Sequence, residues 1–193
     1  IITTSFEWED DYNAVHTILT LNLKGEILNK IYIDNACPGG EAFSGIAVGN
    51  FDSDSELEIV SKYKCNGIII YNRDGTVVSG WPKETKGVLK GMFVTADINN
   101  DDLSELIVPT MTDVYDDLPD ISFEESGGLY IFDSNGNLLN SFNNLNFESS
   151  TLAIANLDSD SELEIVGVEN KIIHIFDQGN DKILATLPDI YHY

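Results

Sequence analysis

The chain has 193 residues, of which 42% are hydrophobic, and it carries 33 acidic residues against 10 basic ones, a formal net charge of -23. The apolar content is too high for a disordered chain, and the length is enough for one domain with its own core. The acidity argues against nucleic acid or an anionic membrane surface as a partner, because both attract clustered lysine and arginine. No apolar run approaches the roughly 18 residues of a membrane-spanning helix, so we expect no membrane insertion.

Tight turns between short β-type runs recur along the whole chain. The turn sequences are NLKG at 22–25, NRDG at 72–75, DSNG at 133–136 and DQGN at 177–180. Asn, Asp and Gly supply the left-handed or side-chain-bonded backbone that tight hairpins need. The flanking runs, such as GIIIY and TVVSGW, are β-branched or aromatic and lack a 3.6-residue period. We therefore predict β-hairpins and almost no helix.

An acidic stretch precedes each of the last three hairpins. The stretch GNFDSDSELEIV at 49–60 returns as ANLDSDSELEIV at 155–166 and, more loosely, as ADINNDDLSELIV at 96–108. A full unit is therefore strand, acidic loop, strand, turn, strand, glycine turn and strand. Four antiparallel strands in ~40–60 residues is the size of one β-propeller blade. The sequence thus predicts an all-β fold, a β-propeller of four-stranded antiparallel blades.

The repeat units divide the chain at approximately 1–42, 43–89, 90–148 and 149–193. The first unit is incomplete, because its opening IITTSFEWEDD aligns with IVPTMTDVYDD at 107–117, which begins in a second strand. We expect about four blades in a single propeller segment. A closed four-blade ring is one alternative, although a rare one. We expect instead that the segment is part of a larger propeller or pairs with another chain, including a second copy, to close one.

The acidic stretches place oxygen-bearing side chains at fixed positions. Counting from Asn50, Asp97 and Asn156 as position 1, positions 1, 3, 5 and 9 carry oxygen in all three loops, and position 7 varies. A variable position 7 is expected if only its backbone carbonyl is used. Calcium takes six to eight oxygen ligands, which a tightly wound loop provides. We therefore predict about three Ca²⁺ ions, bound by Asn50, Asp52, Asp54, Glu56 and Glu58; by Asp97, Asn99, Asp101, Leu103 and Glu105; and by Asn156, Asp158, Asp160, Glu162 and Glu164.

The loops, followed by an apolar strand, resemble the calcium loops of FG-GAP repeats, which form the blades of the integrin α-chain propeller and of many bacterial surface and secreted proteins. The segment DGTVVSGWP at 74–82 also resembles the bacterial members. Two departures are the usual Gly at position 6, here Ser55, Asp102 and Ser161, and Glu in place of Asp at position 9. The resemblance implies a seven- or eight-bladed, calcium-bound propeller outside the cell or at its surface.

The strand order puts the acidic loops and glycine turns on one side of the propeller. Cys37 and Cys65 map to the other side, on adjacent units, so a disulfide and two unrelated thiols both stay open as interpretations. In integrin-like propellers that other face binds partners. By analogy, the insertion at 112–128 is the candidate contact surface for a protein or glycan. The alternatives are a solvated acidic loop and a further cation site. Its candidate contact residues are Asp113, Tyr115, Asp116, Asp117, Asp120 and Phe123.

No P-loop, HExxH, GxSxG or zinc-type spacing occurs in the sequence. We therefore expect a non-enzymatic, calcium-stabilised extracellular propeller that serves adhesion, protein–protein interaction or extracellular assembly. One alternative is a carbohydrate-binding or polysaccharide-cleaving propeller domain. Another is an acidic halophilic domain without metal, which predicts acids spread evenly along the chain and not held at fixed loop positions.

Overall fold

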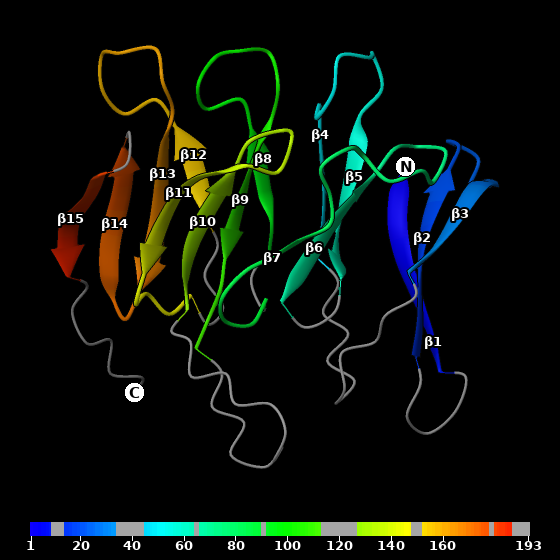
Figure 1. Ribbon diagram of the computed structural model, residues 1–193, viewed down its shortest axis with the longest axis horizontal. Coiled ribbons are helices and arrows are strands. Elements are labelled where there is room, and N and C mark those ends of the chain that lie inside the picture. The colour runs from blue at the N-terminus through cyan, green and yellow to red at the C-terminus, as the bar shows by residue number, and fades with distance from the viewer. Residues whose placement is uncertain are drawn as a thin grey trace.

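The computed structural model describes residues 1–8, 14–33, 45–63, 66–89, 92–112, 127–147, 152–177 and 180–186. The elements of this part of the chain are all β-strands, and none of its segments is a helix long and apolar enough to cross a membrane. The strands form four antiparallel sheets that follow one another along the chain (Figure 1). The all-β prediction is confirmed, whereas closure into a ring stays a prediction.

Each sheet is a meander in which consecutive strands pair. The first sheet contains β1 (Ile2–Trp8), β2 (Ala14–Leu21) and β3 (Ile27–Ile33). The second contains β4 (Ile46–Gly49), β5 (Glu58–Tyr63), β6 (Gly67–Tyr71) and β7 (Lys83–Glu84). The third contains β8 (Val94–Ala96), β9 (Glu105–Pro109), β10 (Gly128–Phe132) and β11 (Leu138–Asn143). The fourth contains β12 (Ala153–Ala155), β13 (Glu164–Glu169), β14 (Ile172–Asp177) and β15 (Asn180–Thr186).

Glycine turns close the last hairpin of the first three sheets. Gly75 has φ +93° and Gly136 has φ +75°, a left-handed backbone that glycine adopts without strain. Their N–H groups donate to the carbonyls of Asn72 and Asp133, both at 2.9 Å. Gly25 makes the same turn between β2 and β3, with φ +82°. The turn sequences therefore form hairpins for the reason that their composition predicted.

Alternate residues of the inner strands face the two neighbouring sheets. In β6, Ile69 and Tyr71 join the apolar cluster shared with the first sheet, whereas Ile68 and Ile70 join the cluster shared with the third. Every residue of β6, β9 and β10 is buried. A strand covered on both faces is almost entirely apolar, which explains GIIIY and the run LIVP that follows Glu105.

Polar contacts also join the second and third sheets. The Thr95 hydroxyl donates to the Val48 carbonyl at 2.6 Å, which ties the first strands of the two sheets together. Val88 and Met111 exchange two backbone hydrogen bonds, at 2.9 and 3.0 Å. The sheets are therefore held in a row by apolar packing and by backbone pairing.

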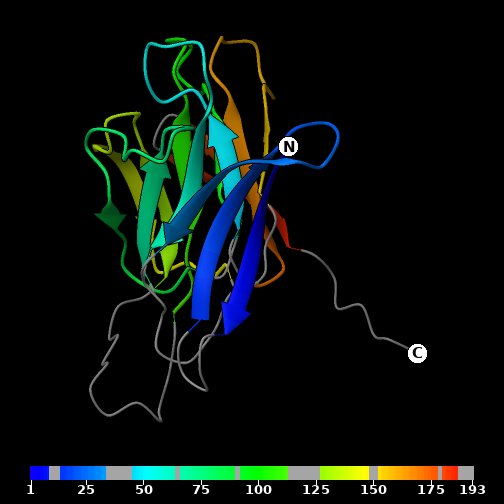
Figure 2. The same ribbon diagram turned by 90° about the vertical axis from the view of Figure 1, so that its right-hand side faces the viewer.

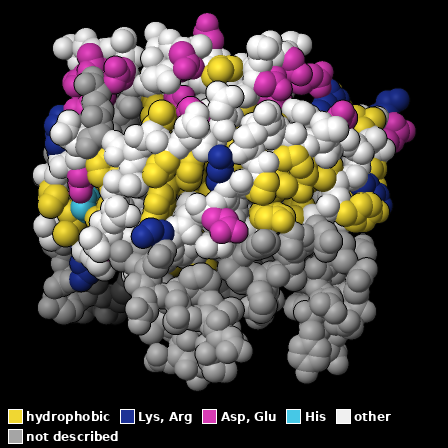
Figure 3. All heavy atoms as spheres, in the orientation of Figure 1, with side chains coloured by type: hydrophobic (Ala, Val, Ile, Leu, Met, Phe, Trp, Pro, Cys, Tyr) yellow, Lys and Arg dark blue, Asp and Glu magenta, His cyan; other side chains and the backbone are white. Residues whose placement is uncertain are grey.

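The β4–β5, β8–β9 and β12–β13 loops, which carry the acidic stretches, project from the same end of the sheets (Figure 1). Figure 2 turns the row so that the first sheet lies nearest the viewer. Acidic side chains gather along the loop end in Figure 3. Like charges are thus brought together at one end of the molecule, where they need neutralisation.

Candidate metal-binding loops

The β4–β5 and β12–β13 loops are wound in the same way. The Asp52 carboxylate accepts the Asp54 N–H at 2.9 Å, and the Asp54 carboxylate accepts the Glu56 N–H at 2.6 Å. In the β12–β13 loop the equivalent bonds run from Asp160 to Asp158 and from Glu162 to Asp160, both at 2.9 Å. Short acidic side chains that bond the backbone two residues on are the reason this sequence curls into a compact loop.

The glutamate at position 9 of each loop is buried where the second strand of its sheet begins. Glu58 and Glu105 are each 1% exposed and Glu164 is 2% exposed. One oxygen of each accepts the N–H of the residue at position 2, at 2.7 Å, 2.9 Å and 2.5 Å respectively. This bond closes the loop and directs the rest of the carboxylate toward the loop interior.

Two loops bring three carboxylates close together. The ligand-type oxygens of Asp52, Asp54 and Glu58 lie within 4.8 Å of one another, and so do those of Asp158, Asp160 and Glu164. The second oxygen of Glu164 is buried and has no hydrogen-bond partner, and the side-chain oxygen of Asn50 is in the same situation. Buried, unpartnered oxygens are costly, and a bound cation removes that cost. These two triads can hold a metal ion.

The β8–β9 loop has the predicted residues in a different arrangement. The Asn99 amide nitrogen lies 3.1 Å from both an Asp101 oxygen and a Glu105 oxygen, so the amide bridges the two carboxylates. The Asp97 carboxylate accepts the N–H groups of Asp101 and Asp102, at 3.0 and 2.9 Å. A flip of the Asn99 amide group would place its oxygen, in place of its nitrogen, between the two carboxylates. In the structure, an N–H donor lies at the point of this loop where only oxygens come together in the other two loops.

The backbone conformation at position 6 also differs between the loops. Asp102 has φ +70°, the left-handed backbone for which the resembling family uses glycine. Ser55 and Ser161, at position 6 of the other loops, are not among the residues with positive φ. Aspartate tolerates this conformation better than most residues. The two serine loops therefore follow a different path at that point, which accommodates the missing glycine.

Burial raises the pKa of two of the position 9 glutamates. The pKa of Glu105 is raised to about 7, chiefly because the carboxyl is removed from water, and the charges of Asp101 and Asp97 add to the rise. The N–H of Ile98 acts in the opposite direction. Burial also raises the pKa of Glu58 above its usual 4.5, followed by the charges of its two aspartate neighbours. These acids therefore resist ionisation unless a positive charge is close.

The remaining predicted ligands lie around the triads. The Asn50 amide donates to the Asp102 carbonyl at 3.0 Å, and the Asn156 amide donates to the carbonyls of Asp160 and Glu162, at 2.8 and 3.3 Å. At position 7, the Glu56 carboxylate pairs with Arg73, at 2.8 Å. The side chains at position 7 therefore lie outside the triads. The cysteines and the predicted contact segment, Cys37, Cys65, Asp113, Tyr115, Asp116, Asp117, Asp120 and Phe123, lie outside the described residues.

Hydrogen bonds between neighbouring loops were not predicted from the sequence. The Ser104 N–H donates to the Asn50 carbonyl at 2.7 Å, and the Ser104 hydroxyl accepts the Asn50 N–H at 3.1 Å. The Leu163 N–H likewise donates to the Ile98 carbonyl at 3.3 Å. The signal available in the sequence was a serine at position 8, where the other two loops have leucine. These bonds link each loop to the next.

No family model and no curated protein matches the chain. Three solved structures match the chain at low similarity. A rhamnogalacturonan lyase PL11 from Bacillus licheniformis has a TM-score of 0.48 and 16% identity, over 92% of this chain and 43% of that one. The exotype rhamnogalacturonan lyase YesX has a TM-score of 0.49 and 14% identity, over 91% and 41%. The rhamnogalacturonan lyase YesW has a TM-score of 0.49 and 14% identity, over 96% and 47%.

The chain thus spans less than half the length of each of these three proteins. Their similarity is too distant to favour one function over another, so the carbohydrate alternative stays open. The resemblance to FG-GAP repeats rests on the acidic loops and the segment at 74–82, and none of the three structures is described as a protein of that family.

Proposed function

We propose that the chain is a calcium-stabilised, non-enzymatic propeller segment of a secreted or cell-surface protein, acting in adhesion, protein–protein interaction or extracellular assembly. Calcium would occupy the three acidic loops, and the partner, a protein or a glycan, would bind the face opposite them. Extracellular calcium modules typically bind at ~10⁻⁴–10⁻³ M, so the ions would be structural outside the cell.

The observation that carries the proposal is the buried oxygen of Glu164, which points to a cation. It lies beside Asp158 and Asp160 and has no hydrogen-bond partner, although the side chain is 2% exposed. The same closure of the loop by the position 9 glutamate recurs at Glu58 and Glu105. A divalent ion at this point would offset two of the three carboxylate charges and fix the hairpin.

The ligand set favours calcium among the divalent cations. All candidate ligands are oxygens, whereas structural zinc sites use cysteine and histidine. Magnesium requires near-ideal octahedral geometry at shorter distances, which suits a loop of mixed carboxylate, amide and carbonyl oxygens less well than the flexible coordination of calcium.

The non-enzymatic part of the proposal is supported by how the described titratable groups are used. The clustered aspartates and glutamates lie in the loops. His174, which is 3% exposed, bonds through its Nδ1 atom to the carboxylate of Asp181 at 2.9 Å and stacks on Phe176. Both contacts of this histidine lie within the fourth sheet.

Thermal unfolding at constant ionic strength tests the proposal, with about 2 mM calcium, with excess chelator, and with magnesium in place of calcium. At a Kd of ~10⁻⁴ M, that calcium concentration stabilises by about 1.8 kcal/mol per site, or about 5 kcal/mol for three sites. For a chain of this size we expect a calcium-specific rise in Tm of roughly 10–20 °C. An equal rise with magnesium, or none, would leave the halophilic alternative ahead.

A further inference from the structure

A recurring contact joins neighbouring sheets next to each glycine turn. The residue six positions after the turn glycine packs against an aromatic residue at the end of the third strand of the next sheet. Trp81 follows Gly75 in this way, and its ring centroid lies 5.9 Å from that of Phe132. Phe142 follows Gly136, with its ring centroid 4.6 Å from that of Phe176. These contacts occupy equivalent places in the repeat.

Between the second and third sheets this place is filled. Trp81 is 7% exposed and Phe51, at position 2 of the β4–β5 loop, is 3% exposed. Their rings meet edge to face, with centroids 6.3 Å apart. The indole N–H donates to the Ser134 carbonyl at 3.1 Å, so the buried polar atom is also satisfied.

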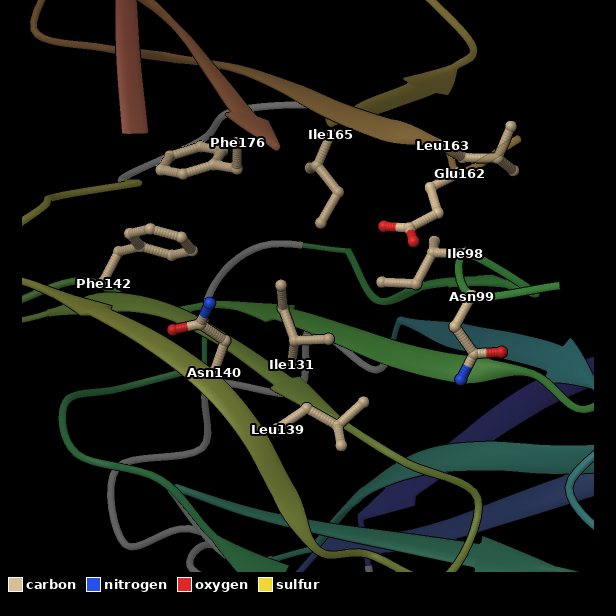
Figure 4. Close-up of a pocket in the computed structure, with 10 residues that line it drawn as sticks. All are labelled: Ile98, Asn99, Ile131, Leu139, Asn140, Phe142, Glu162, Leu163, Ile165 and Phe176. Carbon is tan, nitrogen blue, oxygen red and sulfur yellow. The ribbon is translucent and has the colours of Figure 1, made fainter. Parts of the chain in front are cut away.

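Between the third and fourth sheets the same place is only partly filled. The counterparts are smaller: Phe142 stands where the second sheet has tryptophan, and Ile98 stands where it has phenylalanine. A cleft of about 270 Å³ is left, lined on its apolar side by Ile98, Ile131, Leu139, Phe142, Ile165 and Phe176 (Figure 4). Leu139 is 51% exposed, so the cleft is accessible from solvent.

Two polar side chains are directed into this cleft. Figure 4 shows the Glu162 carboxylate extending into it from the β12–β13 loop and the Asn140 side chain from β11. Among the described residues the Glu162 carboxylate has no hydrogen-bond partner. Its counterpart Glu56, beside the cleft between the first and second sheets, is paired with Arg73 at 2.8 Å. The open cleft therefore combines an apolar interior with a carboxylate that has no partner in the described part of the chain.

We propose that the cleft between the third and fourth sheets binds a tryptophan side chain presented by a partner protein, with the indole N–H donating to Glu162. The equivalent place holds the indole of this chain's own Trp81. A cavity of about 150 Å³ accepts one benzene ring, so about 270 Å³ suits a two-ring group and lies below the range of sites for drug-sized ligands. A buried indole needs an aromatic neighbour and a hydrogen-bond acceptor, and a carboxylate is a stronger acceptor than the carbonyl that Trp81 uses.

This inference rests on the proposed role as an interaction module, but it adds a contact beside the acidic loops, separate from the opposite face, because Ile98 and Glu162 belong to those loops. Its test is separate from the calcium measurement. Binding of N-acetyl-tryptophanamide and of a short peptide with one 5-fluorotryptophan is followed by ligand-observed and fluorine NMR, with calcium and with chelator. We expect a Kd of roughly 1 mM or below for the wild-type chain. N-acetyl-phenylalaninamide, which lacks the ring N–H, and galactose should bind at least tenfold more weakly.

Variants assign the site. Phe142→Trp fills the cleft as Trp81 fills its equivalent, so we expect at least a tenfold loss of binding with an unchanged or higher Tm. Glu162→Ala removes the acceptor and should also weaken binding about tenfold, because a hydrogen bond to a charged group is lost. Glu56→Ala is the matched control at the same loop position and should bind like the wild type.

The proposal is overturned if the wild-type chain does not bind the tryptophan probes, if Phe142→Trp binds them equally well, or if galactose binds in their place. A calcium-independent Tm together with cleft-specific tryptophan binding would instead contradict the calcium proposal and leave the cleft assignment intact.

Discussion

A glutamate buried at the start of a strand is the residue on which each acidic loop depends. Glu58, Glu105 and Glu164 each hold the backbone N–H at position 2 of their loop through one carboxylate oxygen. Full burial of a carboxylate is unfavourable unless it is protonated, hydrogen-bonded or paired with a cation. At each of these glutamates, the remaining cost of burying the carboxylate is therefore removed either by a bound proton or by a metal ion.

The pKa of Glu105 predicts how stability changes with pH in the absence of metal. The folded-state pKa is about 7 against 4.5 for the free residue, so the folded chain binds more protons than the unfolded chain between these values. The contribution of Glu105 to the free energy of unfolding is therefore fully present below about pH 4.5 and is lost as the pH rises through about 7. With chelator present, we expect Tm to fall as the pH is raised from about 5 to about 7, because both values lie within that window. Glu105→Gln should flatten this slope, and a Tm that rises over the same range without metal would contradict the assignment.

Removing the charge of Glu164 separates the effect of the proton from that of the metal. Glu164→Gln keeps an acceptor for the Leu157 N–H but removes the buried charge. We expect metal-free stability to be unchanged or to rise by about 1–3 kcal/mol, the cost of an unpartnered buried group, while the calcium-dependent rise in Tm shrinks. Glu162→Gln, which lies outside the triad, is the control and should keep the full calcium response. Equal calcium responses in the two variants would count against a site at Glu164.

At the scale of elements, glycines differ in whether backbone conformation alone or a contact between sheets requires them. Gly80, near the end of the second unit, has φ +92°, and a Cβ placed there would lie 2.1 Å from the Asn135 carbonyl oxygen in the third sheet's turn. Gly25 has a similar φ of +82° but nothing within 4 Å of such a Cβ. The first glycine is required by the contact between sheets and by the backbone, and the second by the backbone alone.

Alanine substitutions at these two glycines measure the two effects. Gly25→Ala should cost about 1–2 kcal/mol, the strain of a left-handed residue with a side chain. Gly80→Ala should cost clearly more, because the third sheet's turn must also move away. Urea midpoints at matched calcium concentration provide the comparison. If the two variants are equally destabilised, the second and third sheets are not in contact at Gly80.

At the scale of the whole molecule, the sheets differ in how many of their faces are covered. The second and third sheets contribute to apolar clusters on both sides, whereas the first and fourth contribute on one side only. On the first sheet, Leu28 is 55% exposed and Tyr32 65% exposed. Protection from solvent should therefore decrease from the middle of the row toward its ends.

Hydrogen exchange read out by peptide mass tests this gradient. We expect the slowest exchange in β6, β9 and β10, where every residue is buried, and faster exchange in β3 and β15 at the ends of the row. Exchange in the end sheets that slows as the chain concentration rises would reveal that copies cover one another's end faces. Uniform protection at high dilution would contradict the open row of sheets.

The sequence by itself determined the repeating unit of this protein. Strands, glycine turns and the position 9 glutamates follow from local patterns, because a strand's alternation and a turn's backbone requirement depend on residues close in the chain. Only the tertiary structure decided which contacts cross between sheets. The bonds of Ser104 to Asn50 and the cleft beside Phe142 join residues whose proximity depends on how sheets pack. The larger ring of Trp81 fills the contact between its two sheets, whereas the smaller ring of Phe142 leaves a cleft. This difference depends on the neighbouring sheet and cannot be inferred from the local sequence.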